Sequence, residues 1–382
     1  MTATTLRQLW HVAPHAGAHH PALRMGVAAL IPMTVLTAAG HADWAGWALL
    51  GTVTAAYARS DTPRRRLRVQ AAVGLFLLLL VIAATVLVAA AVPGIVLVLA
   101  TALVAGLATV LADTGRWSPP GALFPVFVFG AATTIPAGFT DLPAAAGFCA
   151  AGLLWALSVT AFSDYLRTTI DRHRADPSTP PPFPPEPASP PQPRPAGLFP
   201  SGSAGLSEPR PAGLFPPRPA GPARPAARLT ALHALVCLVG AGVSGALALA
   251  AGLQHPSWAM VAAVVPVVGT ATGPQILRAG HRLIGTLLGV GVSGLIFLHA
   301  PGPLEIAVLT GFLLFGAELM IARNYSLALL FITPVTIGLA HPDTPDRLLT
   351  LMADRALETA IGVLVAVTLI LASHQTRHSI QS

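Results

Sequence analysis

The stretch VQAAVGLFLLLLVIAATVLVAAA, residues 69–91, decides the fold because it is too long and too apolar for a soluble protein. It carries no charged residue, and as an α-helix it would extend about 35 Å, which exceeds the ~30 Å hydrocarbon core of a bilayer. The run is continuously apolar and lacks the alternation of a barrel strand. These features predict a helix that spans a membrane.

Eleven further apolar runs precede and follow this one. They are separated by short segments that contain Pro, Gly, Asp and Arg, as turns should be. Overall, 54% of the 382 residues are hydrophobic and 10% are charged, whereas soluble domains average about 25% charged residues. The sequence therefore predicts an all-α polytopic membrane protein with about 12 transmembrane helices. The additional runs lie near 22–39, 44–58, 94–112, 121–138, 142–163, 229–252, 257–273, 282–299, 303–321, 325–340 and 350–372.

The middle of the chain has a different composition. Residues 176–228 contain 19 of the 37 prolines, and the octapeptide PRPAGLFP occurs at 193–200 and again at 209–216. Such low-complexity, proline-rich sequence is typical of an extended, disordered tether, and a role as a ligand for an SH3-like partner is the alternative. The predicted organisation is an N-terminal arm (1–21), a first six-helix membrane unit (22–170), a proline-rich linker (171–228), a second six-helix unit (229–373) and a tail (374–382).

The placement of arginine predicts the orientation. All 22 basic residues are arginine. With a cytoplasmic N-terminus, the cytoplasmic segments hold the cluster between Arg59 and Arg68 and nearly every other arginine, and only Arg347 and Arg355 fall outside. This positive-inside bias predicts a multi-pass protein of the plasma membrane, with arm, linker and tail in the cytoplasm.

The two predicted halves resemble each other. His41-Ala42-Asp43-Trp44 and His255-Pro256-Ser257-Trp258 each place a tryptophan at the start of a helix. An arginine-bearing turn follows each helix. Since six is an even number of crossings, the halves would be parallel repeats related by an axis along the membrane normal. The tryptophans Trp44, Trp47 and Trp258 are expected to be anchors at the membrane surface.

Motifs for catalysis or cofactor binding are missing or misplaced. Two segments match G-x-G-x-x-G, at 240–245 and 289–294, but both lie inside apolar runs rather than at a strand-to-helix turn. We therefore expect no enzyme, no cofactor and no metal site, and the absence of a basic face argues against nucleic acid. Glycines inside such runs allow close helix packing, and the candidates are Gly285, Gly289, Gly291 and Gly294.

Ionisable residues inside apolar runs are the best pointers to function, because burying charge in a membrane is costly. Glu318 lies about one turn before Arg323. It is either a helix-end residue paired with that arginine or a carboxylate coupled to protons or substrate.

A second group is Asp354, Arg355 and Glu358, in which the two acids share one helix face. It is either an interfacial salt-bridge network or a gate or proton relay at the outer mouth.

Arg278 and Arg282 also share a face. They either attract anions at the cytoplasmic side or serve as positive-inside anchors.

The second half resembles the FUSC family, the fusaric-acid-resistance-like proteins, which are related to aromatic acid exporters. The shared elements are a helix led by Trp258, an R-x-x-G-T-x-x-G helix at 282–289, Asn324-Tyr325-Ser326, Thr333-Pro334 and DRALETAIG at 354–362. The resemblance covers about 229–372 and is faint over 20–165, where the G-T-x-x-G element is missing. The larger exporters have a sizeable soluble domain between their halves, where this chain has only the proline-rich linker.

The resemblance implies a proton-linked or otherwise gradient-driven exporter of small organic anions, including aromatic ones. It implies roles for the motif positions Arg282, Arg355 and Glu358. The expected partners are the lipid bilayer, an organic anion and protons as the coupling ion. A distant likeness to plant malate channels also allows an anion channel or uniporter and a homodimer. A non-transporting scaffold that recruits partners through the linker is the alternative from another class.

Overall fold

The computed structural model describes residues 12, 14, 17–174, 227–269, 271–340 and 344–381, with the side chains of 171–174, 345 and 374–381 left out. The predictions for most of the N-terminal arm and for the proline-rich linker therefore lie outside the described residues. Within the described part every regular element is a helix and no strand occurs, so the prediction of an all-α polytopic membrane protein is confirmed at that level.

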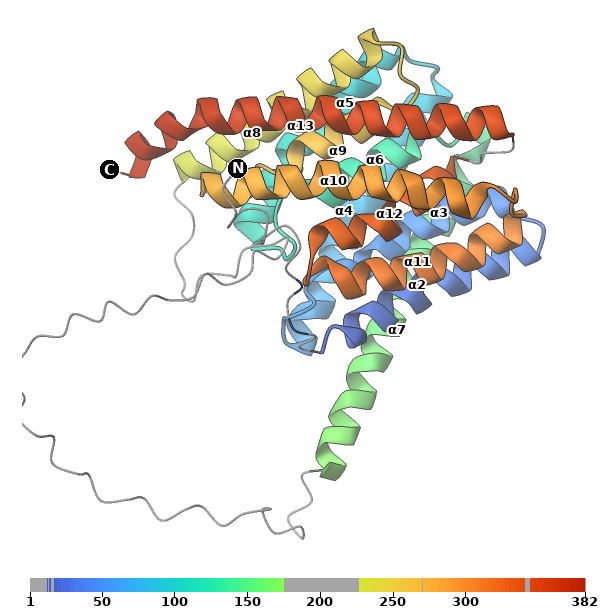
Figure 1. Cartoon of the computed structure of the whole chain (residues 1–382). Coiled ribbons are helices and arrows are strands. Elements are labelled where there is room, and N and C mark those ends of the chain that lie inside the picture. The colour runs from blue at the N-terminus through green and yellow to red at the C-terminus, as the bar shows by residue number, and fades with distance from the viewer. Residues whose placement is uncertain are drawn as a thin grey trace, which may run out of the picture.

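Six α-helices precede the linker and six follow it in the described residues (Figure 1). Two short 3₁₀ helices, η1 (Val53–Ala56) and η2 (Phe139–Asp141), adjoin α3 and α7. The α-helices are α2 (His19–Ala38), α3 (Ala42–Thr52), α4 (Pro63–Ala89), α5 (Gly94–Gly115), α6 (Leu123–Ala132), α7 (Leu142–Arg174), α8 (Ala227–Ala250), α9 (Pro256–Val264), α10 (Thr272–Phe297), α11 (Pro303–Ile321), α12 (Tyr325–Leu339) and α13 (Pro345–Gln381).

Eight of these helices are long and apolar enough to cross a membrane. The other four, α3, α6, α9 and α12, have between 9 and 15 residues. They are the second and fifth helices of each half. Twelve helical segments thus occur where apolar runs were found, but twelve full crossings stay a prediction. α13 also continues beyond the predicted unit end at 373, because no Gly or Pro interrupts the tail.

The turn that follows α3 and η1 is held by polar side chains of α4. A helix that ends inside apolar surroundings leaves carbonyl groups without partners. Arg66 donates to the carbonyl oxygens of Ala58 and Asp61 at 3.1 and 2.7 Å. Gln70 donates to the carbonyl oxygen of Tyr57 at 3.0 Å. These bonds explain how the chain can leave helical geometry at this depth.

The end of α9 is held in the same way by side chains of α10. Gln275 donates to the carbonyl oxygens of Val267 and Gly269 at 2.8 and 2.7 Å. Arg278 donates to the carbonyl oxygen of Val268, and its side chain is buried. We expected the Arg278 guanidinium to attract anions or to anchor the cytoplasmic side. In the structure it donates to the backbone just after α9.

The two halves meet most extensively along two pairs of helices, and α6 also packs on α9. α2 packs on α11, and α5 packs on α8. Figure 1 shows these pairs at opposite edges of the bundle. Inside each half, the second helix packs on the sixth, α3 on α7 and α9 on α13. These contacts are very close: a Cβ at Gly152 would lie 2.0 Å from the carbonyl oxygen of Ala48, and one at Gly362 would lie 2.2 Å from that of Ala259.

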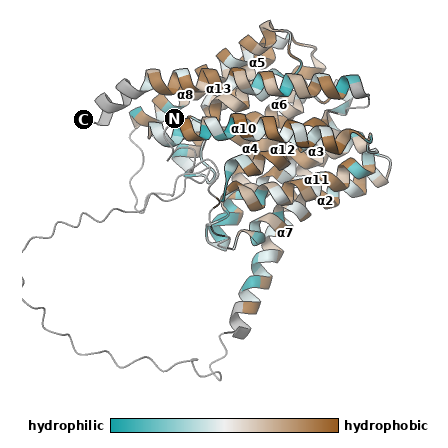
Figure 2. Ribbon diagram, in the orientation of Figure 1, coloured by the Kyte–Doolittle hydropathy of each residue, from teal (hydrophilic) through white to brown (hydrophobic). Residues whose placement is uncertain are grey.

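The outer faces of the long helices are apolar. Leu103, Leu295 and Leu364 are 64, 72 and 68% exposed. Figure 2 shows hydrophobic residues spread over the outside of the helices rather than confined to the interior. A soluble protein rarely exposes contiguous apolar surface of this extent, whereas lipid-facing helices require it.

Candidate functional site

A narrow cavity of about 90 Å³ lies between the two halves. Its walls come from the first half through α2, α3, η1 and α6, and from the second half through α9 to α13. Most of the lining is apolar, and it includes the aromatic rings of Phe124, Phe127 and Trp258. The polar lining residues are Arg282, Glu318, Tyr325, Thr336 and Arg355.

Arg282 extends into this cavity from the middle of α10. It follows the helix start at Thr272 by ten residues, which corresponds to about 15 Å, or half the ~30 Å hydrocarbon core. Its Nη1 donates to the hydroxyl of Tyr325 at 2.9 Å, and the side chain is only 2% exposed. Its Nε and Nη2 have no hydrogen-bond partner.

Arg355 reaches the same cavity from α13. It follows the helix start at Pro345 by ten residues, about 15 Å along the helix. Its guanidinium carbon lies 4.7 Å from the ring centroid of Trp258, a cation–π contact. The side chain is 2% exposed, and Nε has no hydrogen-bond partner. Within the described residues, neither this guanidinium nor that of Arg282 forms an ion pair.

Trp258 is positioned by the residues at the start of α9. The ring of His255 stacks on it, with centroids 4.4 Å apart and planes at 12°. The backbone N–H of His255 donates to Glu358 at 3.0 Å, and that of Gln254 donates to Asp354 at 3.3 Å. Both acids thus accept backbone N–H groups at the start of α9, which have no partner within the helix. Burial lowers the pKa of the His255 imidazole, which favours its neutral form.

Substitution Glu358→Ala should lower stability more than the matched change Glu305→Ala. Glu358 is fully buried and accepts the amide of His255, so its loss leaves a buried donor unpaired and should cost about 2 kcal/mol. Glu305 accepts the amide of Gly302 at 2.9 Å at an exposed helix start, where water can replace it. Thermal unfolding in detergent would compare the two, and equal shifts would contradict the capping role.

Glu318 forms an ion pair between the halves. Its carboxylate lies 3.2 Å from Nη2 of Arg59, which follows η1 in the first half, and its side chain is 5% exposed. The fold thus gives this carboxylate an ion-pair partner, Arg59, that spacing along the chain did not indicate. Glu318 also lines the cavity, so this ion pair lies between the cavity and the loop that precedes α4.

A neighbouring group of charges was not found from the sequence. Asp164 of α7 lies 3.6 Å from Arg24 of α2 and forms a second ion pair with Arg66 of α4. All three side chains are buried. The sequence does contain an indication of this group. Asp164 directly follows an apolar run, and a single acid at such a position requires a cationic partner.

The four packing glycines fall into two groups. Gly285 and Gly289 face α12, where an added Cβ would lie 2.6 Å from the carbonyl oxygens of Ser326 and Leu329. A Cβ at Gly294 would lie 3.1 Å from the Met352 methyl, and one at Gly291 would meet no atom within 4 Å.

Two of the three tryptophans expected at the membrane surface are buried in protein. Trp47 and Trp258 are 3 and 8% exposed. The expectation that they are surface anchors is therefore wrong for these two, because each belongs to a short helix packed inside the bundle.

Comparison with known proteins identifies part of the chain. Residues 243–369 match the model of the fusaric acid resistance protein-like family. This region contains the cavity residues Trp258, Arg282, Glu318, Tyr325 and Arg355. The resemblance seen in the sequence of the second half is therefore confirmed.

A curated relative adds little beyond the membrane assignment. The uncharacterized membrane protein YvaC of Bacillus subtilis (strain 168) is 36% identical over 86 residues, which is 22% of this chain. The match spans only 14% of that relative's length. No solved structure matches the chain.

Proposed function

We propose that this chain, a multi-pass membrane protein with a fusaric acid resistance protein-like region, is a gradient-driven exporter of small organic anions. At the level of the family, the match supports a membrane transporter. The direction of transport, the class of substrate and the driving gradient are parts of the proposal.

The two guanidiniums in the cavity carry this proposal. Arg282 and Arg355 are 2% exposed and have nitrogen atoms without hydrogen-bond partners. Buried charges in proteins are normally paired, because an unpaired one costs several kcal/mol. A carboxylate is the natural partner of a guanidinium, since it accepts two parallel hydrogen bonds. An organic carboxylate would neutralise these groups and leave its apolar part against Trp258 and Phe127.

The cavity is too small to hold such a substrate in the present conformation. Its volume of about 90 Å³ is well below the ~300 Å³ of the smallest typical ligand sites. The described conformation is therefore closed, and admission of substrate requires the halves to move apart on one side. The short helices α3, α6, α9 and α12 surround the cavity, and interrupted helices at matching positions of two halves are typical of transporter binding sites.

Several matched features support two parallel six-helix repeats. The short helices are second and fifth in each half. His41 stacks on Trp44 at 4.0 Å and 10°, as His255 stacks on Trp258. The α2–α11 pair joins the first helix of one half to the fourth of the other, and α5–α8 does the reverse. We further propose that all twelve helical segments lie in the plasma membrane, with both termini and the linker cytoplasmic, as the arginine bias requires.

Transport in reconstituted vesicles tests this function. Vesicles with and without the protein would be loaded with a panel of aromatic and aliphatic carboxylic acids, and a pH gradient and then a membrane potential would be imposed. We expect protein-dependent flux of at least one acid that follows the pH gradient. The coupling candidates Glu318, Asp354 and Glu358 would be compared as amide variants, with Glu318→Gln first.

The rival functions give different outcomes. Flux that follows the potential and survives Glu318→Gln would indicate an anion channel or uniporter. No flux above empty vesicles, with protein shown to be folded, would overturn the proposal. A loss of cellular function when 176–228 is deleted, without any effect of Glu318→Gln, would favour a scaffold.

A further inference from the structure

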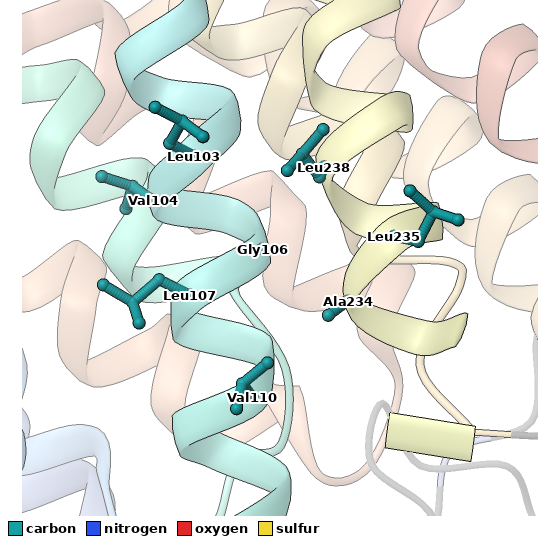
Figure 3. A pocket seen from close by; sticks show the side chains of 8 residues that line it. All are labelled: Leu103, Val104, Gly106, Leu107, Val110, Ala234, Leu235 and Leu238. Carbon is teal, nitrogen blue, oxygen red and sulfur yellow. The ribbon is translucent and has the colours of Figure 1, made fainter. Parts of the chain in front are cut away.

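An open apolar groove runs between the two halves on the outside of the bundle, along α5 and α8. Figure 3 shows this groove, which has a volume of about 590 Å³. Its lining comes only from these two helices and includes no polar side chain. Leu103, Leu107 and Leu235 of the lining are 64, 52 and 56% exposed. The groove has the size of a typical ligand site, about 300–1,000 Å³, and is separate from the cavity that contains Arg282.

Contacts along α5 and α8 define how the two helices run past each other. A Cβ added at Gly94 would lie 3.3 Å from the side chain of Leu249. A Cβ added at Gly106 would lie 3.2 Å from the side chain of Leu238. A step forward along α5 thus corresponds to a nearly equal step backward along α8. The helices are antiparallel, so the end of α5 and the start of α8 lie at the same end of the groove.

This register places one arginine from each half at that end. Ten residues beyond the second contact, forward along α5 and backward along α8, are Arg116 and Arg228. The helices stay in contact in this direction, because Nδ1 of His233 and Oδ2 of Asp113 are 2.8 Å apart. Arg228 precedes the lining residue Leu235 by seven residues, or about two turns, and therefore lies on the groove face of α8.

Positive charge predominates at this end of the groove. Arg116 directly follows α5, and Arg228 is exposed at the second position of α8. Arg65, which is 45% exposed, donates to the carbonyl oxygen of Arg116 at 3.5 Å and adds a third guanidinium. Of the two acids nearby, Asp61 pairs with Arg65 at 2.9 Å, and Asp113 is bound by its imidazole partner. These groups together carry a net positive charge.

The surroundings of the groove indicate what occupies it. α5 and α8 are both long and apolar enough to cross a membrane, so lipid surrounds their outer faces. From Leu103 to Arg116 is thirteen residues, or about 20 Å, which is half of a bilayer of ~40–45 Å including its headgroups. The groove and its charged end thus match the length of one lipid in one leaflet. In the proposed orientation this is the cytoplasmic leaflet, whose anionic lipids give the surface a negative potential.

We propose that the groove between α5 and α8 binds one anionic phospholipid, with an acyl chain along the groove and the phosphate held by Arg116 and Arg228. A basic pocket between transmembrane helices is suited to an anionic headgroup. Since each half supplies one helix and one arginine, the lipid bridges the halves and stabilises their contact at this edge. This inference does not depend on the proposed transport function.

Lipid binding to the full-length protein in detergent tests the proposal. Native mass spectrometry would measure the affinity of the first bound molecule for three probes. These are phosphatidylglycerol, phosphatidylcholine with the same acyl chains, and glycerol phosphate, which has the anionic group without chains. We expect phosphatidylglycerol to bind about tenfold more tightly than phosphatidylcholine, because arginines near the membrane surface attract anionic lipid. Glycerol phosphate should not bind at the same concentrations.

Substitutions place the lipid on the two parts of the site. Arg116→Gln and Arg228→Gln should each weaken phosphatidylglycerol binding about fivefold and leave phosphatidylcholine unchanged. Arg167→Gln, an exposed arginine on α7, is the control for these changes. Ala234→Phe fills the groove and should weaken both lipids, whereas Leu295→Phe on the exposed face of α10 should weaken neither. Phosphatidylglycerol should also raise the unfolding temperature by about 5 °C in the wild type, and by less in the two arginine variants.

Three results would overturn the proposal. Equal affinity for phosphatidylglycerol and phosphatidylcholine would mean that the arginines do not recognise the headgroup. Equal binding of glycerol phosphate would mean that the groove plays no part. Wild-type affinity in both arginine variants would place the lipid elsewhere, and so would wild-type affinity in Ala234→Phe. Unfolding temperatures without lipid would show which variants are folded, and the arginine variants decide alone if Ala234→Phe is not.

Discussion

Replacing Arg355 with glutamine is expected to reduce organic-anion flux about 100-fold. Loss of one member of a buried charge pair costs about 3 kcal/mol, and each 1.4 kcal/mol corresponds to a factor of ten in affinity. The guanidinium is held over the ring of Trp258, with its carbon 4.7 Å from the ring centroid. Glutamine keeps most of the side-chain volume, which limits the effect on packing.

Arg282→Gln should have an effect of similar size, because its guanidinium lines the same cavity. The double variant should be little worse than either single variant, since two groups that bind one carboxylate act together. Equilibrium binding of the transported acid to detergent-solubilised protein would measure the loss directly, beside the flux in vesicles. Arg68→Gln is the matched control, because that guanidinium is exposed on α4.

Two results would contradict this assignment. If Arg355→Gln and Arg282→Gln keep wild-type affinity, the anion does not bind in the cavity between the halves. If their losses multiply in the double variant, the two guanidiniums serve separate sites. The unfolding temperature of both variants must also be measured, so that loss of folded protein is not counted as loss of binding.

Hydropathy alone was enough to place the helical segments. The twelve apolar runs correspond to the helices α2 to α13, because lipid leaves a long apolar segment no alternative to a helix. Spacing also identified Arg282 and Arg355 as residues of interest. Their positions were expected at opposite mouths of the protein, whereas both line one cavity between the halves.

The contacts between helices could not be read from spacing. Glu318 has Arg323 five residues away in sequence, but its partner is Arg59, 259 residues away. The side chains of Asp113 on α5 and His233 on α8 are hydrogen-bonded at 2.8 Å, yet the two residues are 120 positions apart and give no sequence signal as a pair. Arg278 donates to the backbone just after α9, a contact that spacing did not indicate. Each of these depends on which helices pack together, which periodicity does not encode.

A leucine at Gly289 is expected to prevent stable folding, whereas a leucine at Gly291 on the same helix should be tolerated. A Cβ at Gly289 would lie 2.6 Å from the carbonyl oxygen of Leu329 and 2.7 Å from Cβ of Thr333, while one at Gly291 meets nothing within 4 Å. The obstacle at Gly289 is backbone of α12, which cannot rotate away as a side chain can. The two helices would have to separate, and overpacking of this kind costs about 3 kcal/mol.

The comparison isolates packing from helix propensity, because both changes replace glycine by leucine in the interior of α10 and gain the same preference for helix. We expect Gly291→Leu to retain the yield and unfolding temperature of the wild type in detergent, and Gly289→Leu to lose most folded protein. Gly289→Ala should fall between them. α12 begins at Tyr325, the partner of Arg282, so a displaced α12 would also disturb the guanidinium in the cavity. Any Gly289 variant that does fold should therefore bind the organic acid more weakly. If Gly289→Leu and Gly291→Leu are equally stable, α10 and α12 do not pack as described.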